Sequence, residues 1–227
     1  MIIGSGLLAR TFHDAAKDRS DVVIYAAGVS NSQCRDVREF DRERNLLERS
    51  LQATDVLTCF VYFSTCSIAD PESPDTPYVQ HKLRMEQIVR AHPSHLILRL
   101  PHVAGRTPNP HTLLNYLYAR IARGERFAVW RHARRNVIDC NDLRTLSLAL
   151  IDSGVRGETL NVANVRDYAI LEIVRTLERI CRGHAVYDLV DRGAAYPIDV
   201  SRLLPFAEAA ITFNESYLEN VLRKYYG

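Results

Sequence analysis

The chain reads FVYFSTCSI at residues 60–68 and YVQHKLRME at residues 78–86. The first stretch belongs to an apolar run that begins at Val56, which predicts a buried strand ending at the hydroxyls of Ser64 and Thr65. A turn-rich loop over residues 70–75 follows, and an amphipathic pattern then predicts a helix from about Tyr78. Strand, loop and helix in this order favour an α/β fold.

Tyr78 and Lys82 are four residues apart, so they share one face of the predicted helix. An ammonium near a phenol favours the phenolate and therefore lowers the pKa of the tyrosine. A tyrosine that gives and takes a proton near neutral pH suits redox chemistry between a carbonyl and an alcohol. A hydroxyl at the end of the preceding strand is placed to hydrogen-bond the same substrate oxygen.

These residues resemble the Ser/Thr, Tyr-x-x-x-Lys centre of the short-chain dehydrogenase/reductase superfamily. The flanking residues resemble its extended branch, the NAD-dependent epimerase/dehydratase family, which acts on nucleotide sugars. The resemblance implies that Thr65, Tyr78 and Lys82 are catalytic, with Thr65 chosen over Ser64 because the family uses the second hydroxyl. Thr65 would polarise the substrate oxygen and Tyr78 would transfer the proton. Lys82 would lower the pKa of Tyr78 and hold a ribose hydroxyl of the cofactor.

The N-terminal stretch MIIGSGLLARTF predicts a short strand, a tight turn with Gly4-x-Gly6-x-x-Ala9, and a helix to about Lys17. Glycines allow close approach of the backbone to a ligand, and the helix N-terminus offers free N–H groups to a pyrophosphate. This context is typical of a dinucleotide site. We therefore expect NAD or NADP as the cofactor, with Gly4, Gly6, Leu7 and Leu8 in contact with it.

The next strand, VVIYAAGVSNS at residues 22–32, follows the first helix directly. It resembles a later strand of the family, whose end lies along the cofactor and corresponds here to Ala26, Ala27 and Gly28. The usual second strand and the third strand are therefore predicted to be missing, and with them the acidic or basic residue that holds the adenosine ribose. Either other residues rebuild this site, with Arg10, Asn31 and Arg35 as candidates, or cofactor binding is weak or lost.

Other site residues are implied by the same resemblance. Ser64 and Pro101 would lie beside the cofactor, and Ser67 and His102 beside the substrate. Arg135 matches the arginine that grips the substrate diphosphate, with an exposed arginine cluster as the alternative. Relatives that dehydrate sugars carry an acidic pair where this chain has Cys66 and Ser67, which disfavours a dehydratase.

Residues 34–53 predict a helix dense in charge. We expect Val37, Phe40, Leu46, Leu47 and Leu51 to form its buried side and the charged residues to form a solvated face.

Composition sets further expectations. The chain has 227 residues, 47% of them hydrophobic, and a net charge of +2, which predicts neither a nucleic-acid nor a membrane partner. Five scattered cysteines indicate reduced thiols in a cytoplasmic protein rather than disulfides, and we expect no metal site.

The expected fold is a doubly wound parallel Rossmann-like sheet that lacks the usual second and third strands. Residues 1–100 would form the truncated dinucleotide-binding core with the catalytic helix. Residues 101–227 would add the remaining core elements and a small C-terminal α/β substrate lobe, in a single structural unit. The resemblance implies a homodimer that reduces or epimerises a nucleotide-linked keto- or hydroxy-sugar with NAD(P). The alternative is a cofactor-impaired relative that binds a nucleotide sugar or a partner subunit without redox turnover.

Overall fold

The computed structural model describes residues 1–72 and 74–227. Its central sheet is parallel throughout, in the order β1-β2-β3-β4-β8. The strands are β1 (Ile2–Ile3), β2 (Val22–Tyr25), β3 (Cys59–Thr65), β4 (His95–Leu100) and β8 (Glu158–Asn161). Every residue of β2 and β3 is buried, as expected for central strands covered by helices on both faces. The parallel sheet flanked by helices confirms the predicted α/β class.

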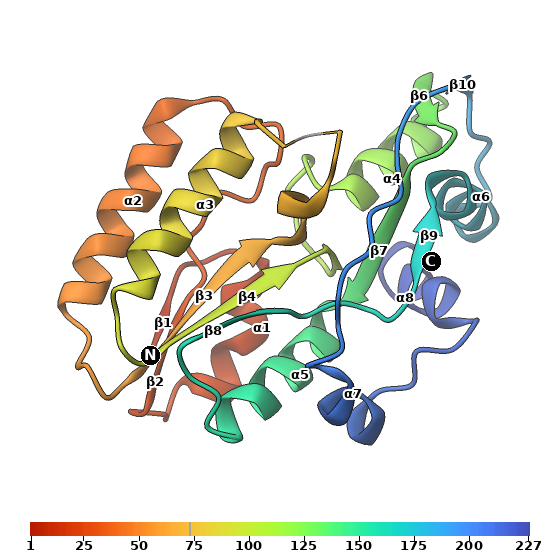
Figure 1. Cartoon of the computed structure of the whole chain (residues 1–227). Coiled ribbons are helices and arrows are strands. Elements are labelled where there is room, and N and C mark those ends of the chain that lie inside the picture. Colours follow the sequence, from red (N-terminus) through yellow and green to blue (C-terminus); the bar gives the residue numbers. More distant parts are fainter. Residues whose placement is uncertain (73) are drawn as a thin grey trace.

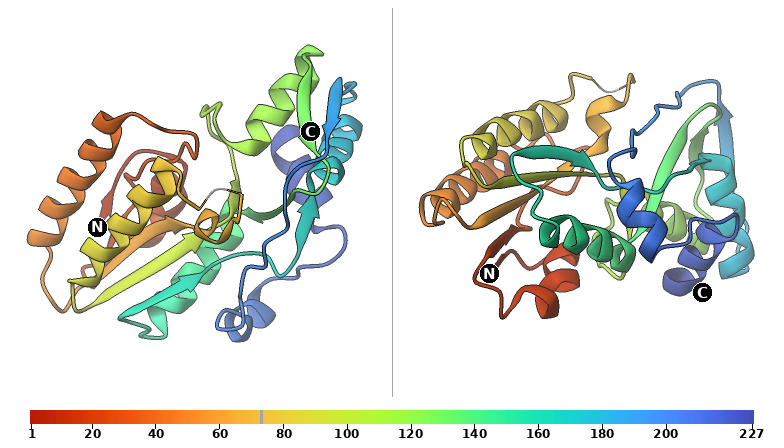
Figure 2. Two further views of the ribbon diagram at one scale, coloured as in Figure 1. Left: turned by 45° about the horizontal axis from the view of Figure 1, so that its top comes forward. Right: turned by 60° about the horizontal axis from the view of Figure 1, so that its bottom comes forward.

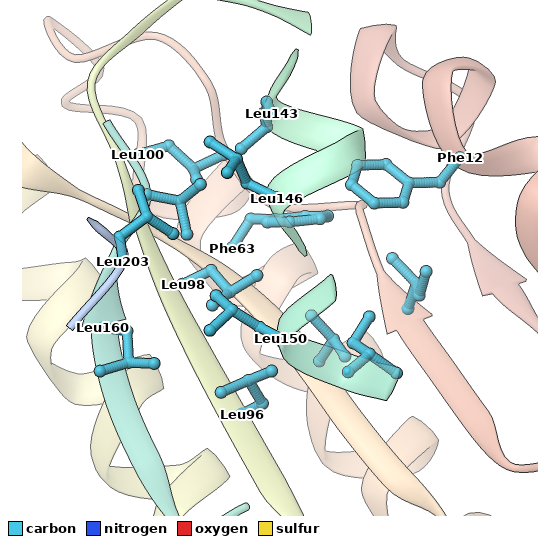
Figure 3. Close-up of a cluster of buried hydrophobic side chains, with 14 of the residues drawn as sticks. Phe12, Phe63, Leu96, Leu98, Leu100, Leu143, Leu146, Leu150, Leu160 and Leu203 are labelled. Carbon is cyan, nitrogen blue, oxygen red and sulfur yellow. The ribbon is translucent and has the colours of Figure 1, made fainter. Parts of the chain in front are cut away.

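Two pairs of helices cover the sheet (Figure 1). One face packs against α2 (Val37–Gln52) and α3 (Pro77–Arg90), and the other against α1 (Leu7–Ala16) and α5 (Cys140–Asp152). On the second face, Phe12 of α1 and three leucines of α5 point toward Phe63 of β3 and the leucines of β4 (Figure 3). Full burial of each such side chain stabilises the fold by about 1.5–3 kcal/mol, so this cluster fixes α1 and α5 on the sheet.

β1 is the edge strand of the sheet in the described part of the chain. It pairs in parallel with β2, with Ile2 opposite Ile24, and α1 makes the crossover between them. No strand pairs with the outer edge of β1 among the described residues. The sheet therefore ends where the sequence predicted that the second and third strands are missing.

A second group of elements forms its own apolar core beside the sheet (Figure 2). Strands β5 (His102–Ala104), β7 (Arg134–Asp139) and β9 (Asp167–Ala169) form one small sheet, and β6 (Phe127–Trp130) pairs with β10 (Tyr187–Val190). The helices α4 (Leu113–Arg123), α6 (Ile170–Cys181) and α8 (Tyr217–Tyr226) pack around them, while α7 (Leu204–Ala210) packs near α5. Because β5 follows β4 after one residue, this group lies at the carboxyl ends of the central strands.

The strand that the sequence predicts before Ser64 and Thr65 begins too early. β3 starts at Cys59, and Val56 and Leu57 are 58% and 86% exposed. The side chain of Asp55 accepts a hydrogen bond from the N–H of Leu57, and its carbonyl accepts one from Thr58. This turn precedes the strand, so its apolar residues do not enter the sheet.

We expect Gly4→Ala to destabilise the protein, because Gly4 has φ +130° and an added Cβ would lie 2.6 Å from the carbonyl carbon of Ala26. Backbone strain of this kind costs about 1–3 kcal/mol, and the contact adds to it. Gly6→Ala is the matched control, since no atom lies within 4 Å of its added Cβ. Urea unfolding checks the prediction, and equal stability of the two variants would contradict it.

Candidate active site

A cavity of about 860 Å³ opens at the carboxyl ends of β2, β3 and β4. Its other wall comes from α4, β6 and β7, so it lies between the central sheet and the second group of elements. Parallel α/β sheets bind ligands at this edge, because loops and helix N-termini meet there. The cavity is therefore the candidate active site.

Most of the site residues predicted from the sequence line this cavity. They are Gly6, Leu7, Leu8, Ala26, Gly28, Ser64, Thr65, Ser67, Tyr78, Lys82, Pro101, His102 and Arg135. Gly4 and Ala27 do not line it. Gly4 packs against Ala26, and the carbonyl of Ala27 accepts a hydrogen bond from Arg42 at 3.3 Å.

Thr65, Tyr78 and Lys82 are brought together, and all three are buried. Thr65 ends β3 and caps the short 3₁₀ turn η1 (Cys66–Ala69), where its Oγ1 accepts from the N–H of Ser67 at 3.1 Å. Tyr78 lies in the first turn of α3, which begins with Thr76 as the N-cap and Pro77 at its first position. Lys82 follows one helical turn later, as the spacing predicted.

Lys82 acts on the pKa of Tyr78 in the predicted direction, but the net shift is upward. Burial raises the pKa of the Tyr78 phenol above its usual value, although Lys82 and the Thr65 hydroxyl act to lower it. The negative charge of Glu43 raises this pKa further. Burial of Tyr78 thus outweighs the charge of one ammonium, which is itself paired with a carboxylate.

The partner of Lys82 is Glu43 on α2, whose carboxylate is fully buried. Its oxygens contact four groups, with Lys82 Nζ and the His81 ring at 3.0 Å, the Tyr62 hydroxyl at 2.7 Å and the N–H of Val29 at 2.6 Å. Burial by itself raises the pKa of Glu43, but Lys82 and these hydrogen bonds lower it well below its usual range. The prediction that the charged residues of this helix form a solvated face is therefore wrong for Glu43.

The predicted buried side of α2 is also wrong at Val37, which is 65% exposed. Phe40, Glu43 and Leu47 are spaced by three and four residues and share a helical face, and Phe40 stacks on the His81 ring. A carboxylate within an apolar stripe was the signal in the sequence that could have revealed Glu43.

A second buried carboxylate, that of Glu86, accepts a hydrogen bond from the hydroxyl of Ser64. Ser64 Oγ donates to Glu86 Oε1 at 2.6 Å, and Arg99 makes two bonds to the same carboxylate at 2.7 and 2.8 Å. Ser64 therefore lines the cavity with its hydroxyl already engaged. This leaves Thr65 as the hydroxyl beside Tyr78.

Arg135 of β7, the residue predicted to bind the substrate diphosphate, lines the cavity. Its guanidinium contacts the carboxylate of Asp70 at 3.3 Å and lies 5.6 Å from the centre of the Tyr196 ring. Nη1 donates to the carbonyl of Arg134 at 2.7 Å. Asp70 and Tyr196 are cavity residues that the sequence analysis missed, because neither belongs to a recognisable motif.

His102 and Cys66 are both held in their uncharged forms. Burial and the charge of Arg135 lower the pKa of His102 to about 4, so the ring is neutral at pH 7. Burial raises the pKa of the Cys66 thiol to about 12, and the thiol donates to the carbonyl of Arg99 at 3.3 Å. Neither side chain carries a charge that would attract or repel an anion in the cavity.

The candidates for a rebuilt adenosine site lie apart. Asn31 lines the cavity, and its Oδ1 accepts from the N–H of Gln33 at 2.9 Å. Arg10 instead ties the glycine turn to the loop after β5, since its guanidinium donates to the carbonyls of Ser5 and Arg106. Arg35 is exposed and is not among the cavity residues.

The five cysteines carry free thiols. No cluster of metal-binding side chains is found among the described residues. Within the same part of the chain, every helix is too short or too polar to cross a bilayer.

A protein-family model described as "NAD dependent epimerase/dehydratase family" matches residues 6–163. A comparison with curated proteins finds no match.

Solved structures share the fold. UDP-glucuronic acid 4-epimerase from Bacillus cereus, in complex with UDP-glucuronic acid and NAD, is 20% identical with a TM-score of 0.75, over 97% of this chain and 77% of that chain. dTDP-glucose 4,6-dehydratase from Bacillus anthracis, in complex with NAD, is 14% identical with a TM-score of 0.70, over 95% and 74%. RMD from Pseudomonas aeruginosa, complexed with NADPH, is 16% identical with a TM-score of 0.73, over 98% and 95%. This likeness confirms the Rossmann-like fold class.

We expect the free energy of unfolding to fall as the pH is lowered from about 5 to about 3. The folded-state pKa values of Glu43 and Glu86 are both lowered, so their contribution is present above the unfolded-state pKa and is lost as the pH falls. Urea unfolding at a series of pH values measures this loss. Glu86→Gln should show a shallower pH dependence than the unchanged protein, and identical slopes would contradict the assignment.

Proposed function

Because the chain belongs to the NAD-dependent epimerase/dehydratase family, we propose that it reduces or epimerises a nucleotide-linked keto- or hydroxy-sugar with NAD or NADP. The observation that carries the proposal is the meeting of Thr65, Tyr78 and Lys82 in one cavity wall, at the carboxyl ends of the strands and beside the glycine turn. A module that only binds has no need of all three groups.

The residues around the glycine turn fit a dinucleotide. Gly6 caps α1 without any side-chain bond, so the first N–H groups of the helix are free for a phosphate. An added Cβ at Gly6 would meet no protein atom within 4 Å, which leaves room for a ligand against the backbone. Gly6, Leu7 and Leu8 would hold the pyrophosphate, and Ala26, Gly28, Ser64 and Pro101 would contact the rest of the cofactor. The bound nicotinamide supplies or accepts the hydride.

Tyr78 would supply the proton. Its raised pKa keeps the phenol protonated at neutral pH, which is the form that donates to a carbonyl oxygen. Thr65 would hydrogen-bond the same oxygen, because its hydroxyl lies beside the Tyr78 phenol and lines the same cavity. Lys82 stabilises the phenolate that remains after the transfer. The protonated phenol is the form that reduction of a carbonyl would use.

Dehydration is disfavoured by the same geometry. It would require an acid and a base next to Thr65, and Cys66 occupies the adjacent position. Because the pKa of its thiol is raised to about 12 and its proton is directed to the carbonyl of Arg99, Cys66 serves neither role near pH 7.

Arg135 would bind the substrate diphosphate, with Ser67 and His102 beside the sugar. A guanidinium suits this work because it is always charged and makes paired bonds to phosphate oxygens. Asp70 holds Arg135 in the structure, so a diphosphate must compete with this carboxylate. The neutral ring of His102 adds no second positive charge.

Two observations favour a second candidate function, a relative that binds a nucleotide sugar or a partner subunit without redox turnover. The sheet ends at β1 in the described residues, which removes the adenosine side of the site. The protons of Lys82 are directed at protein acceptors rather than at the cavity. Binding of NADH or NADPH decides between the two functions.

The family resemblance and the free cysteines also lead us to propose a cytoplasmic homodimer. Residues 1–100 would be its truncated cofactor-binding core and residues 101–227 the remaining core and substrate lobe, in one structural unit.

We expect Tyr78→Phe to retain NADH or NADPH binding and to lower turnover by about 10²–10⁴-fold, because the phenol proton is lost while the ring remains. Calorimetric titration measures binding, and absorbance of the reduced cofactor measures turnover with UDP- and dTDP-linked sugars. Tyr116→Phe is the control, since Tyr116 lines the same cavity outside the Thr65, Tyr78 and Lys82 set. Absence of binding of either cofactor at millimolar concentration would overturn the enzyme proposal.

We expect Asp70→Asn to tighten the binding of UDP or dTDP and Arg135→Gln to weaken it, each by about tenfold, because a charged hydrogen bond contributes about 1.5–3 kcal/mol. Arg134→Gln is the control, since Arg134 bonds Asp167 and does not line the cavity. Calorimetry at constant salt measures the three affinities. Weaker binding by Asp70→Asn would show that Arg135 does not receive the diphosphate.

A further inference from the structure

Glu43 and Lys82 join three elements at the catalytic centre. Glu43 lies on α2 and Lys82 on α3, with 3.0 Å between Oε1 and Nζ. The ammonium also donates to the Tyr62 hydroxyl on β3 at 3.0 Å and to the carbonyl of Phe63 at 3.4 Å. An ammonium has three protons, so each has an acceptor within the protein.

The carboxylate of Glu43 is equally well satisfied. Oε1 accepts from Lys82 and from the Tyr62 hydroxyl, while Oε2 accepts from the N–H of Val29 and contacts the His81 ring. Gly28 allows the pair to approach the backbone, because an added Cβ there would lie 2.7 Å from Lys82 Nζ and 2.9 Å from Glu43 Oε1. The pair is therefore a built arrangement rather than a chance contact of two long side chains.

Both charges are almost completely buried, since Glu43 is 0% and Lys82 2% exposed. Burial disfavours the charged form of an amine, and a nearby carboxylate restores it. Tyr62 and the Phe63 carbonyl are neutral, so they orient the ammonium but do not balance its charge. Glu43 is the group that makes a cationic lysine possible at this depth.

We propose that Glu43 is a positioning residue of the redox centre, which holds Lys82 at the end of β3 and keeps it cationic beside Tyr78. This inference rests on the proposed function, because it takes the roles of Tyr78 and Lys82 from there. It assigns a role to a residue on α2 that itself does not line the cavity.

The groups that face the pair come from every neighbouring element. Tyr25 of β2 donates its hydroxyl to the backbone carbonyl of Glu43, and Tyr62 of β3 contacts both charges. His81 and Tyr78 come from α3 itself. Among the groups that face the pair, the charges of Lys82 and Glu43 have the largest effect on Tyr78.

The pair as a whole favours the Tyr78 phenolate. Lys82 lowers the pKa of Tyr78 more strongly than Glu43 raises it. A neutral Lys82 would leave only the Thr65 hydroxyl to oppose the effect of burial, and proton release from Tyr78 would become harder. Glu43 therefore supports catalysis through Lys82, although its own charge acts in the opposite direction.

The chain has three lysines, Lys17, Lys82 and Lys224, so isotope-labelled lysine gives an NMR spectrum in which each can be titrated. The Lys82 signal is assigned by its loss in Lys82→Met. We expect Glu43→Gln to lower the titration midpoint of Lys82 by about one to three pH units, the range that a close opposite charge produces. The control Glu39→Gln, which removes an exposed carboxylate of α2 paired with Arg42, should leave the midpoint in place.

An unchanged Lys82 midpoint in folded Glu43→Gln would overturn the proposal. If this variant does not fold, the double variant Glu43→Gln with Lys82→Met keeps the test, because removing both charges relieves the unpaired ammonium. Recovery of cooperative unfolding in the double variant supports the pairing, and no recovery overturns it.

The same labelled protein separates this inference from the proposed function. Addition of NADH or NADPH should shift the Lys82 signal if the cofactor binds at the glycine turn. A midpoint that moves in Glu43→Gln without any response to cofactor would retain the inference about Glu43 and reject the enzyme. If the Lys82 signal responds to cofactor but its midpoint does not move in Glu43→Gln, the inference about Glu43 is rejected and the enzyme proposal is retained.

Discussion

A buried ammonium needs a buried anion, and this constraint organises the centre of the protein. Lys82 reaches the end of β3 from α3, and Glu43 meets it from α2, so one ion pair joins two helices to the central strand. Both partners have their remaining hydrogen bonds satisfied within the protein. Removing one of the two charges would leave the other buried and unpaired. The ion pair therefore favours the arrangement of α2, α3 and β3 in which both charges meet.

The second buried carboxylate also lies between α3 and the central sheet. Glu86 lies one helical turn after Lys82 on α3 and binds Ser64 of β3 and Arg99 of β4. Two polar anchors thus set the position of α3 along the sheet. The first turn of α3, which carries Tyr78, is thereby held beside Thr65 at the mouth of the cavity. Apolar packing alone would fix the face of this helix but would constrain its position along the strand less tightly.

The fold was largely readable from the sequence because its signals are local. Apolar runs and helical periodicity predicted β3 and α3, and the resemblance of residues 22–32 to a later strand of the family predicted a sheet without the usual second and third strands. The errors at Val56 and Val37 have one cause. Hydrophobicity predicts that a residue can be buried, but the turn and the helix rotation decide whether it is, and Val56 and Val37 remain exposed.

The sequence by itself determined which residue types form the site, because Tyr78 and Lys82 share a helix face and Thr65 ends the strand before them. Only the tertiary structure decided their charge states. The pKa of Tyr78 depends on its burial and on Glu43, which lies thirty-five residues away in the chain, and no spacing rule covers that distance. Asp70, Arg135 and Tyr196 meet for the same reason, since three separate segments converge on one cavity. Local pattern sets the residues of a helix or strand, whereas electrostatics acts between neighbours in space.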